Sequence, residues 1–359
     1  MSAEHDMRDR FFTVVGVLAI TIAVVSGQTK KASAPSRLAG GHPDLTGTYD
    51  LATLTPLERP TGMAAVLSDE EAAKLEKQAA ERVESGAAPI KGDRPAPPKG
   101  GDGSAGPAGN VGGYNTFWLD PGSRYSIIKG ERRTSIVIDP PTGRVPPLTA
   151  EARQRNAARV VRTTSDEVIR ENDPGFEGGG AYDDPERRPL GERCLLGFSS
   201  TSGPPALPNY FYNNLHQIVQ TRDSVMILTE MVHDARIVRM GAEHLPKTIR
   251  KWMGDSVGRW EGDTLVVDTT NFTDKTRFRG SGENLHVIER FSRIDADTLL
   301  YRFTIDDPTT WAQPWTGEYT WPATKELLYE YACHEGNYAL GNILRGARLK
   351  EADDALKKK

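Results

Sequence analysis

A strand–turn–strand pattern at residues 252–272, WMGDSVGRWEGDTLVVDTTNF, constrains the fold of this chain more than any other feature. Residues 256–260 are compatible with a β-strand, residues 261–263 supply a turn, and residues 264–270 are rich in β-branched side chains. Glycine adopts positive φ without steric cost and aspartate tolerates it, so Gly262-Asp263 is typical of a tight turn. The stretch therefore predicts an antiparallel hairpin.

Short apolar or alternating segments separated by turn residues recur along the chain. Further strands are expected at residues 117–119, 125–128, 134–138, 215–220, 225–232, 233–240, 286–294, 299–305, 318–321 and 327–333. Successive hairpins without helical crossovers predict a mainly β protein with an antiparallel meander. A long meander removes its exposed edges by closing into a barrel or a two-layer sheet, and we expect one of these.

Two peripheral helices accompany the strands. Ser68-Asp69-Glu70-Glu71 is a capping box that opens a helix ending near Ser85, and residues 149–163 form a second, Arg-rich helix. The expected organisation is a linker at residues 28–43, an N-terminal segment with one helix and a Gly/Pro-rich loop at 44–113, a main β-rich domain at 114–348, and a charged, frayed tail at 349–359.

Residues 1–27 have the features of an export signal. An uncharged apolar run, Phe11–Val25, follows Arg8 and Arg10 and ends at small residues. The run is shorter than the roughly 18–20 apolar residues of a membrane-spanning helix. An uncleaved anchor and a buried core helix are the alternatives, and translation could begin at Met1 or Met7. We expect a periplasmic or secreted protein.

The charge balance argues against a nucleic-acid partner. The formal net charge is −4, whereas binding nucleic acid needs a concentrated basic face. Membrane contact is expected only through residues 1–27.

Two short sequence motifs match known patterns but lack the structural context that those patterns need. The G-x-G-x-x-G at residues 101–106 lies among prolines and glycines, and the G-x-S-x-G at 254–258 leads into a hairpin rather than a helix.

The chain has two cysteines, Cys194 and Cys333. Disulfides persist in the oxidising compartments that exported proteins reach, so we expect the two to be bridged. Two buried free thiols are the alternative. A single pair without C-x-x-C spacing is poor evidence for zinc.

Three long strings resemble a large family of exported bacterial proteins to which no activity is attached: GRWEGDTLVVDTTNF, ERFSRIDADTLLYRFTIDDPTTWAQPW and YEYACHEGNYALGNILRGAR. The resemblance covers residues 136–348 and implies export without implying a reaction. His216 stands where the family pattern has Asn or Tyr, which makes it a minor site candidate. Separately, Gly47-Thr48-Tyr49 resembles the Gly-x-Trp opening of lipocalin-like barrels.

Two pairs of histidine and carboxylate lie at ends of expected strands: His233 with Asp234, and His334 with Glu335. Strand ends carry the loops that ring a barrel mouth, where these groups could act as acid and base or bind a metal. Arg236 could hold an anionic group there. These five residues are the candidate catalytic residues. Alternatively, each histidine simply caps a strand end and hydrogen-bonds a turn.

Aromatic side chains suggest a binding site for an apolar or amphipathic molecule. The candidate ligand-binding residues are Trp252, Trp260, Trp311 and Trp315, with core packing as the alternative. Four charged residues in or beside apolar strands are interpreted as a solvent-facing surface rather than a polar cavity: Glu289, Arg290, Arg302 and Asp306.

Three function classes follow. The first, which we favour, is an exported barrel that binds a small apolar or amphipathic ligand. The second is an exported hydrolase or lyase that uses the histidine–carboxylate pairs. The third is a structural or interaction protein of the cell envelope. The sequence identifies no cofactor and no metal.

Overall fold

The computed structural model describes residues 36–87, 119–158, 160–162, 168–170, 182–197, 203–209, 212–276 and 278–357. The chain divides into two units, Met1–Ser33 and Ala34–Lys359, and every described residue belongs to the second. The expected export signal at residues 1–27 and the strand at 117–119 lie outside the described residues.

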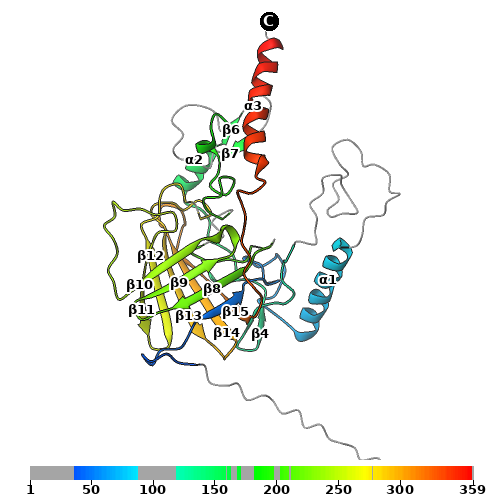
Figure 1. Ribbon diagram of the computed structural model, residues 1–359. Helices are drawn as coiled ribbons and strands as arrows, with labels where there is room; N and C mark the ends of the chain where they lie inside the picture. The colour runs from blue at the N-terminus through cyan, green and yellow to red at the C-terminus, as the bar shows by residue number, and fades with distance from the viewer. Residues whose placement is uncertain are drawn as a thin grey trace, which may run out of the picture. The chain divides into compact units, whose positions relative to one another are not determined.

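Nine strands form a closed β-barrel, and a tenth strand pairs with one of them. Figure 1 shows the barrel with most of its strands labelled. The barrel strands are β1 (Gly47–Asp50), β8 (Leu215–Gln220), β9 (Ser224–Thr229), β10 (Ala235–Met240), β11 (Asp255–Glu261), β12 (Thr264–Thr270), β13 (His286–Arg293), β14 (Thr298–Asp306) and β15 (Trp315–Thr324). Pairing of β1 with both β8 and β15 closes the barrel, and β5 (Val137–Asp139) pairs with β15 beside β1. The predicted mainly β fold with barrel closure is confirmed.

One neighbouring pair departs from the predicted antiparallel meander. β10 and β11 are parallel, joined by residues 241–254, whereas the other neighbouring strands of the ring are antiparallel. Antiparallel pairing reverses strand direction at each step, so a ring with an odd number of strands cannot alternate all the way round. A nine-stranded closed barrel therefore requires at least one parallel pair, and the long 241–254 connection makes it possible here.

The opening hairpin is confirmed as β11–β12, whose register pairs Trp260 with Leu265 and Glu261 with Thr264. The hairpin expected at residues 286–305 is confirmed as β13–β14. The last expected hairpin is wrong in its second half, because residues 325–333 are described and contain no strand. β15 ends the sheet, and the chain continues as a connection towards the C-terminal helix.

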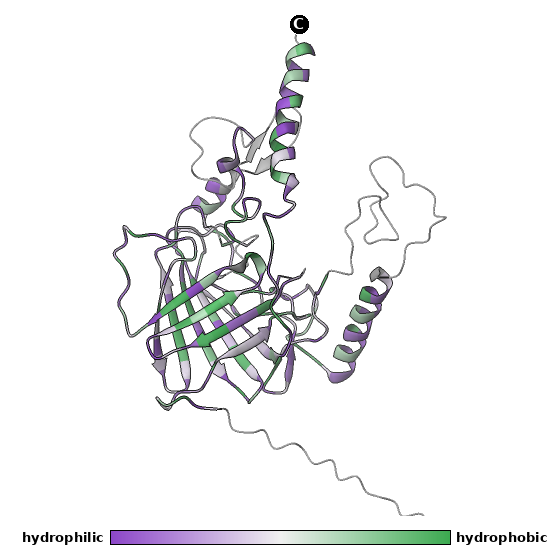
Figure 2. Ribbon diagram, viewed as in Figure 1, coloured by the Kyte–Doolittle hydropathy of each residue, from purple (hydrophilic) through white to green (hydrophobic). Residues whose placement is uncertain are grey.

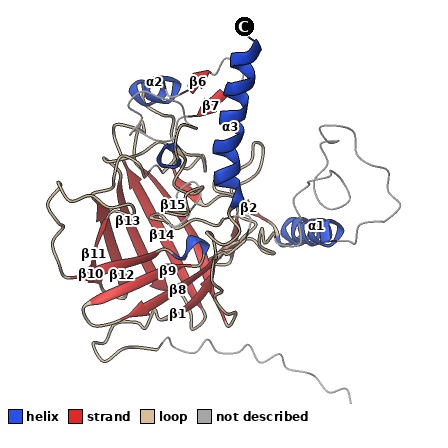
Figure 3. Cartoon of the chain, turned by 45° about the horizontal axis from the view of Figure 1, so that its top comes forward, coloured by secondary structure: helices blue, strands red, loops and turns tan. Residues whose placement is uncertain are grey.

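The remaining elements lie outside the barrel wall. One small sheet contains β2 (Val66–Leu67), β3 (Ile127–Ile128) and β4 (Glu131–Arg133), and another contains β6 (Val160–Arg162) and β7 (Val168–Arg170). Two short 3-10 helices are η2 (Pro185–Arg187) and η4 (Met231–His233). The α-helices, blue in Figure 3, are α1 (Asp69–Ala87), α2 (Ala150–Ala158) and α3 (Tyr338–Lys357). The third was not expected.

One prediction about the helices is confirmed and one is wrong. The capping box of α1 forms as predicted, since the Ser68 N–H donates to Glu71 Oε2 at 2.9 Å and the Glu71 N–H donates to Ser68 Oγ at 3.2 Å. The tail expected to fray from residue 349 is instead helical to Lys357. No helix among the described residues has the length and apolar character needed to span a membrane.

Hydrophobic residues follow the barrel strands, as Figure 2 shows, and alternate side chains of strands such as β13 and β14 are buried. Aromatic rings dominate this core: Trp321 packs against Tyr301 with ring centroids 4.6 Å apart and against Phe291 at 5.5 Å. Ala206 also lies in the interior, where its N–H donates to Tyr301 Oη at 2.9 Å and its carbonyl accepts from Tyr319 Oη at 3.0 Å. Residues 203–209 therefore help to fill the barrel.

Candidate functional site

The predicted disulfide is present. Cys194 and Cys333 are bonded, with Cα atoms 5.8 Å apart, and join two segments 139 residues apart in sequence. One segment, residues 182–197, contains η2, and the other leads from β15 to α3. The bond therefore fixes the connection that precedes α3 to a segment far upstream.

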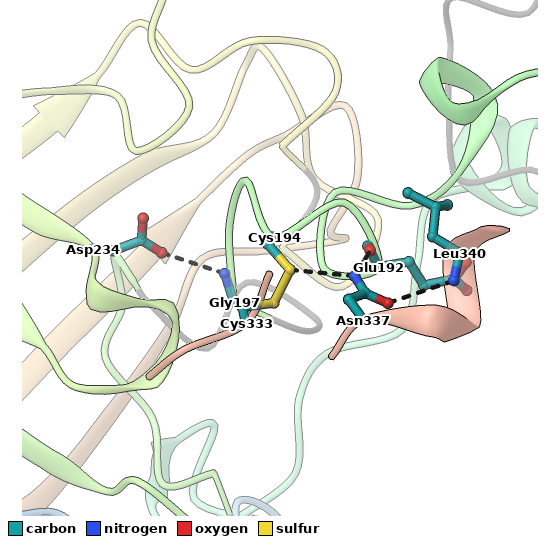
Figure 4. The surroundings of a disulfide bond; sticks show 7 residues. All are labelled: Glu192, Cys194, Gly197, Asp234, Cys333, Asn337 and Leu340. Carbon is teal, nitrogen blue, oxygen red and sulfur yellow. Dashed lines mark hydrogen bonds between the residues drawn. A yellow bond between two sulfur atoms is a disulfide. The ribbon is translucent and has the colours of Figure 1, made fainter. Parts of the chain in front are cut away.

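Hydrogen bonds extend this frame on both sides of the bond (Figure 4). Asn337 Nδ2 donates to the Glu192 carbonyl at 3.3 Å and contacts Cys194 Sγ at 3.6 Å, while the Leu340 N–H donates to Asn337 Oδ1 at 3.4 Å. Asn337 thus holds the first turn of α3 against the Cys194 segment.

Asp234, a candidate catalytic acid, belongs to the same frame. Its Oδ2 accepts a hydrogen bond from the Gly197 N–H at 3.3 Å, three residues after Cys194 (Figure 4). The connection after β15 is held at the same end of the barrel, because the Tyr329 N–H donates to Glu230 Oε1 at 2.9 Å, four residues before Asp234. The segments that carry Asp234 and Cys333 therefore meet, although Cys333 ends no strand, because residues 325–333 are a connection and not the predicted strand.

A pocket of about 440 Å³ lies beside the disulfide. Its lining joins both bonded segments to α3 and includes Glu192, Glu330, Glu335, Tyr331, Leu340 and Ile343. This volume is within the range of about 300–1,000 Å³ that is usual for small-molecule sites. Sequence reasoning found Glu335 and the disulfide but not the part contributed by α3.

The charge of this pocket is negative. Glu192 is paired with Arg188, whose Nε and Nη2 donate at 2.9 and 3.0 Å. Glu330 and Glu335 are exposed, and no described cation forms an ion pair with either of them. Two exposed carboxylates without a paired cation would attract a cationic group.

The part of the pocket lining that α3 contributes includes two apolar side chains. Leu340 and Ile343 lie three residues apart on α3, a spacing that places both on one helix face, and each is half-buried. Tyr331 adds a ring that stacks on Tyr212 with centroids 6.4 Å apart. A pocket lined by both apolar side chains and unpaired carboxylates suits a molecule with a hydrocarbon body and a cationic head.

Arg236 lies elsewhere. Its side chain points into the barrel, 5% exposed, and forms a bidentate ion pair with the fully buried Glu289 through contacts of 2.5 and 2.8 Å. Tyr301 Oη donates to Glu289 Oε1 at 2.8 Å. Burial and the Glu289 charge raise the pKa of Tyr301 well above its ordinary value, so its hydroxyl remains a donor. Arg236 therefore holds a protein carboxylate rather than a ligand anion.

This ion pair corrects the interpretation of Glu289 as a surface charge. Glu289 falls on the inward-facing register of β13, with Val287 and Phe291 on either side. His216, the minor candidate, is also internal: burial lowers its pKa to about 4, and its Nε2 contacts Thr229 Oγ1 at 3.1 Å. It is a neutral core histidine.

The other predicted residues are dispersed. His334 is exposed on the connection before α3, and His233 lies in η4, with its side chain outside the described part of the structure. Trp311 and Trp315 pack together in the core with ring centroids 5.8 Å apart. Trp260 stacks on His42 at 4.5 Å, and Trp252 is 37% exposed on the 241–254 connection. These residues do not form one cluster.

A chain of carboxylates and imidazoles that sequence reasoning missed crosses the outer face of β11, β12 and β13. Asp255 Oδ2 lies 3.3 Å from His244 Nδ1, His244 Nε2 lies 3.0 Å from Asp268 Oδ1, and the same oxygen lies 2.9 Å from His286 Nε2. Both ring nitrogens of His244 therefore face acceptors, and both can donate only when the ring carries two N–H groups.

The electrostatics follow from these contacts. Burial alone would raise the pKa of Asp255, but hydrogen bonds from the Leu245 N–H, Lys251 and His244 outweigh it and lower that pKa to about 2. Burial likewise opposes ionisation of Asp268, yet its hydrogen bonds from His286 and His244 lower its pKa. The Asp268 hydrogen bond raises the pKa of His286, with a smaller contribution from the charge of Asp306. The pKa of His286 therefore lies above its ordinary value, although burial opposes the rise.

Only one feature of the sequence indicated this carboxylate–imidazole chain. Asp268 interrupts the β-branched run of residues 264–270, and a carboxylate in such a strand needs partners. Its partners come from the 241–254 connection and from β13, so they could be identified only once the strand register was known.

The raised pKa of His286 predicts a pH-dependent contribution to stability. Such a group stabilises the fold fully below its unfolded pKa of about 6.5 and loses that contribution as pH rises through its higher folded pKa. Wild type should therefore exceed His286→Gln in unfolding free energy by more at about pH 6 than at about pH 9, measured by urea denaturation. The facing groups are Asp268 and Asp306, and Asp268→Asn should remove most of the slope. A difference that is constant with pH would contradict this.

No group of three or more His, Cys, Asp or Glu among the described residues could hold a metal ion. No family model, no curated protein and no solved structure matches the chain. The resemblance to exported bacterial proteins therefore stays a prediction, and the function must be argued from the geometry.

Proposed function

We propose that the protein binds a small amphipathic molecule with a cationic head in the pocket beside the Cys194–Cys333 disulfide. The observation that carries this proposal is that two uncompensated carboxylates, Glu330 and Glu335, and two apolar side chains, Leu340 and Ile343, line one pocket of about 440 Å³. The carboxylates would hold the head by charge, and the two apolar side chains would remove the hydrocarbon body from water.

We propose further that binding occurs after export, in an oxidising compartment. The apolar run near the N-terminus and the disulfide both support this location. The disulfide would also pre-organise the pocket, because it ties together two of the segments that line it, and pre-organisation lowers the entropic cost of binding.

Binding of decyltrimethylammonium, measured by isothermal titration calorimetry below its micelle concentration, tests the proposal. Wild type should bind it at one site, and Glu330→Gln and Glu335→Gln should each weaken binding roughly fivefold, since one charge at contact distance in water contributes about 1 kcal/mol. Glu70→Gln, an exposed carboxylate on α1, is the matched control and should leave the affinity unchanged. Equal binding of decanoate, or no effect of the two pocket variants, would contradict the proposal.

Acid–base catalysis is the second candidate, favoured by the carboxylate–imidazole chain rather than by the predicted pairs. Asp268 orients His286 through Nε2, and within the described residues Nδ1 has no hydrogen-bond partner, so it can act as a general base. If the protein hydrolyses p-nitrophenyl esters, His286→Ala should reduce the rate roughly 10²- to 10⁴-fold. His334→Ala is the control, because His334 is exposed and does not belong to the carboxylate–imidazole chain. Equal rates for the two variants would exclude His286 as a general base.

A further inference from the structure

The connection between the parallel strands β10 and β11 carries a run of exposed residues that the proposed function does not use. Pro246–Trp252, with the sequence PKTIRKW, are all exposed. Ile249 is 46% and Trp252 is 37% exposed, which is unusual for large apolar side chains at adjacent turns of one loop. Three cations stand among them, Lys247, Arg250 and Lys251. Arg250 pairs with Glu283 at 3.5 Å and Lys251 with Asp255 at 3.1 Å, so Lys247 carries the charge that is not paired.

The loop is held firmly, so the exposure of its apolar side chains does not result from fraying. At its start, the Leu245 N–H donates to Asp255 Oδ2 at 2.9 Å, and Asn271 Nδ2 donates to the Leu245 carbonyl at 2.8 Å. His244 adds its two contacts to Asp255 and Asp268. Near its end, the Lys251 N–H donates to the Asn271 carbonyl at 3.0 Å.

The tip itself is shaped by a turn and an anchored arginine. The Ile249 N–H donates to the Pro246 carbonyl at 2.8 Å, which closes a turn over Lys247 and Thr248. Arg250 Nη1 donates to the carbonyls of Phe272 and Glu283, each at 3.0 Å. Ile249 is therefore presented on a constrained turn.

We propose that this loop inserts its tip into the surface of an anionic phospholipid bilayer. Tryptophan favours the interface between hydrocarbon and headgroups, an aliphatic side chain adds apolar contact, and lysine and arginine attract anionic headgroups. Lys247 has no acidic partner among the described residues, and it belongs to the same exposed run as Ile249 and Trp252. Two apolar residues are too few for the core of a protein interface of roughly 800 Å² per partner. They are enough for shallow insertion.

This surface is separate from the disulfide pocket, so the inference does not depend on the proposed function. It extends membrane contact beyond the N-terminal segment. The full-length chain keeps that segment, so the test must report on the loop itself. Trp252 provides such a signal, because subtracting the spectrum of Trp252→Phe from that of wild type isolates its emission.

The experiment measures quenching of Trp252 by brominated phosphatidylcholine in vesicles containing about one third phosphatidylglycerol, in low salt. We expect the Trp252 emission to shift to shorter wavelength and to be quenched, and both effects to diminish severalfold at about 0.5 M salt, where charges are strongly screened. Ile249→Ser with Lys247→Gln should reduce the quenching severalfold. Ile294→Ser is the matched control: it is 49% exposed, but Asp295 and Asp297 follow it, and it should leave the quenching unchanged.

Two results would overturn the inference. Vesicle-bound protein whose Trp252 emission is neither shifted nor quenched would show that the loop stays in water. Equal quenching in vesicles of pure phosphatidylcholine, with no salt dependence, would show that anionic headgroups are not recognised. A response of Trp252 to heparin but not to vesicles would likewise replace the bilayer with a soluble polyanion.

Discussion

Arg236→Met should lower the free energy of unfolding by about 3–5 kcal/mol, because it leaves the fully buried Glu289 carboxylate without its cation. The loss should appear in urea denaturation at neutral pH as a lower midpoint with an unchanged slope. A surface ion pair is the appropriate comparison. Arg259→Met, which removes an exposed partner of Glu261, should cost less than about 1 kcal/mol.

A second variant separates loss of the ion pair from general damage to the core. Arg236→Met combined with Glu289→Gln leaves no buried charge and retains an acceptor for the Tyr301 hydroxyl. The double variant should regain roughly half of the stability that Arg236→Met loses, by the same argument that removing both partners costs less than removing one. If the double variant were less stable than either single variant, the ion pair would not be the source of the effect.

Removal of the disulfide should have a comparably large effect. Cys194→Ser with Cys333→Ser opens a loop with a sequence separation of 139, and we expect the unfolding free energy to fall by about 2–5 kcal/mol. Affinity for decyltrimethylammonium should fall as well, because two of the segments that line the pocket are no longer tied together. Reductant should reproduce both losses in wild type and leave the double variant unchanged. Stability that is insensitive to reductant would contradict the structural role of the bond.

The hairpins were predictable because local turn chemistry specifies them. Gly262-Asp263 and the β-branched run after it define β11–β12 without reference to the rest of the chain. The parallel contact of β10 with β11 was not predictable in this way. It depends on β1, more than 160 residues upstream of β8, entering between β8 and β15 and making the number of strands odd. Alternation along a chain does not reveal how a ring closes.

The site shows the same division. The disulfide followed from residue type and compartment. The segments of Asp234 and Cys333 do meet, but not as two strand ends, because residues 325–333 form no strand. The prediction that Arg236 lies with Asp234 at the barrel mouth was wrong. Two residues separated by one position share a face only if a single strand contains both of them. Asp234 is outside β10, at the C-terminal cap of η4, and Arg236 is the second residue of β10 and points inward.

The carboxylate–imidazole chain shows why some sites cannot be found from one sequence. The residues that contact each other in this chain are 11 to 24 positions apart in sequence, so no motif search would group them. They are His244, Asp255, Asp268 and His286. They come together through the register of β12 against β13 and through the 241–254 connection between the parallel strands β10 and β11. Asp268 was the single visible anomaly.

Methyl NMR spectroscopy of isoleucine-labelled protein tests the central claim, ligand binding beside the disulfide, most directly. On titration with decyltrimethylammonium, the δ1 methyl signal of Ile343, which lines the pocket, should shift and saturate with one binding curve. The signals of Ile237 and Ile294, which are exposed elsewhere, should stay in place. An unchanged Ile343 signal, or parallel shifts of all three that fail to saturate, would contradict the proposed site.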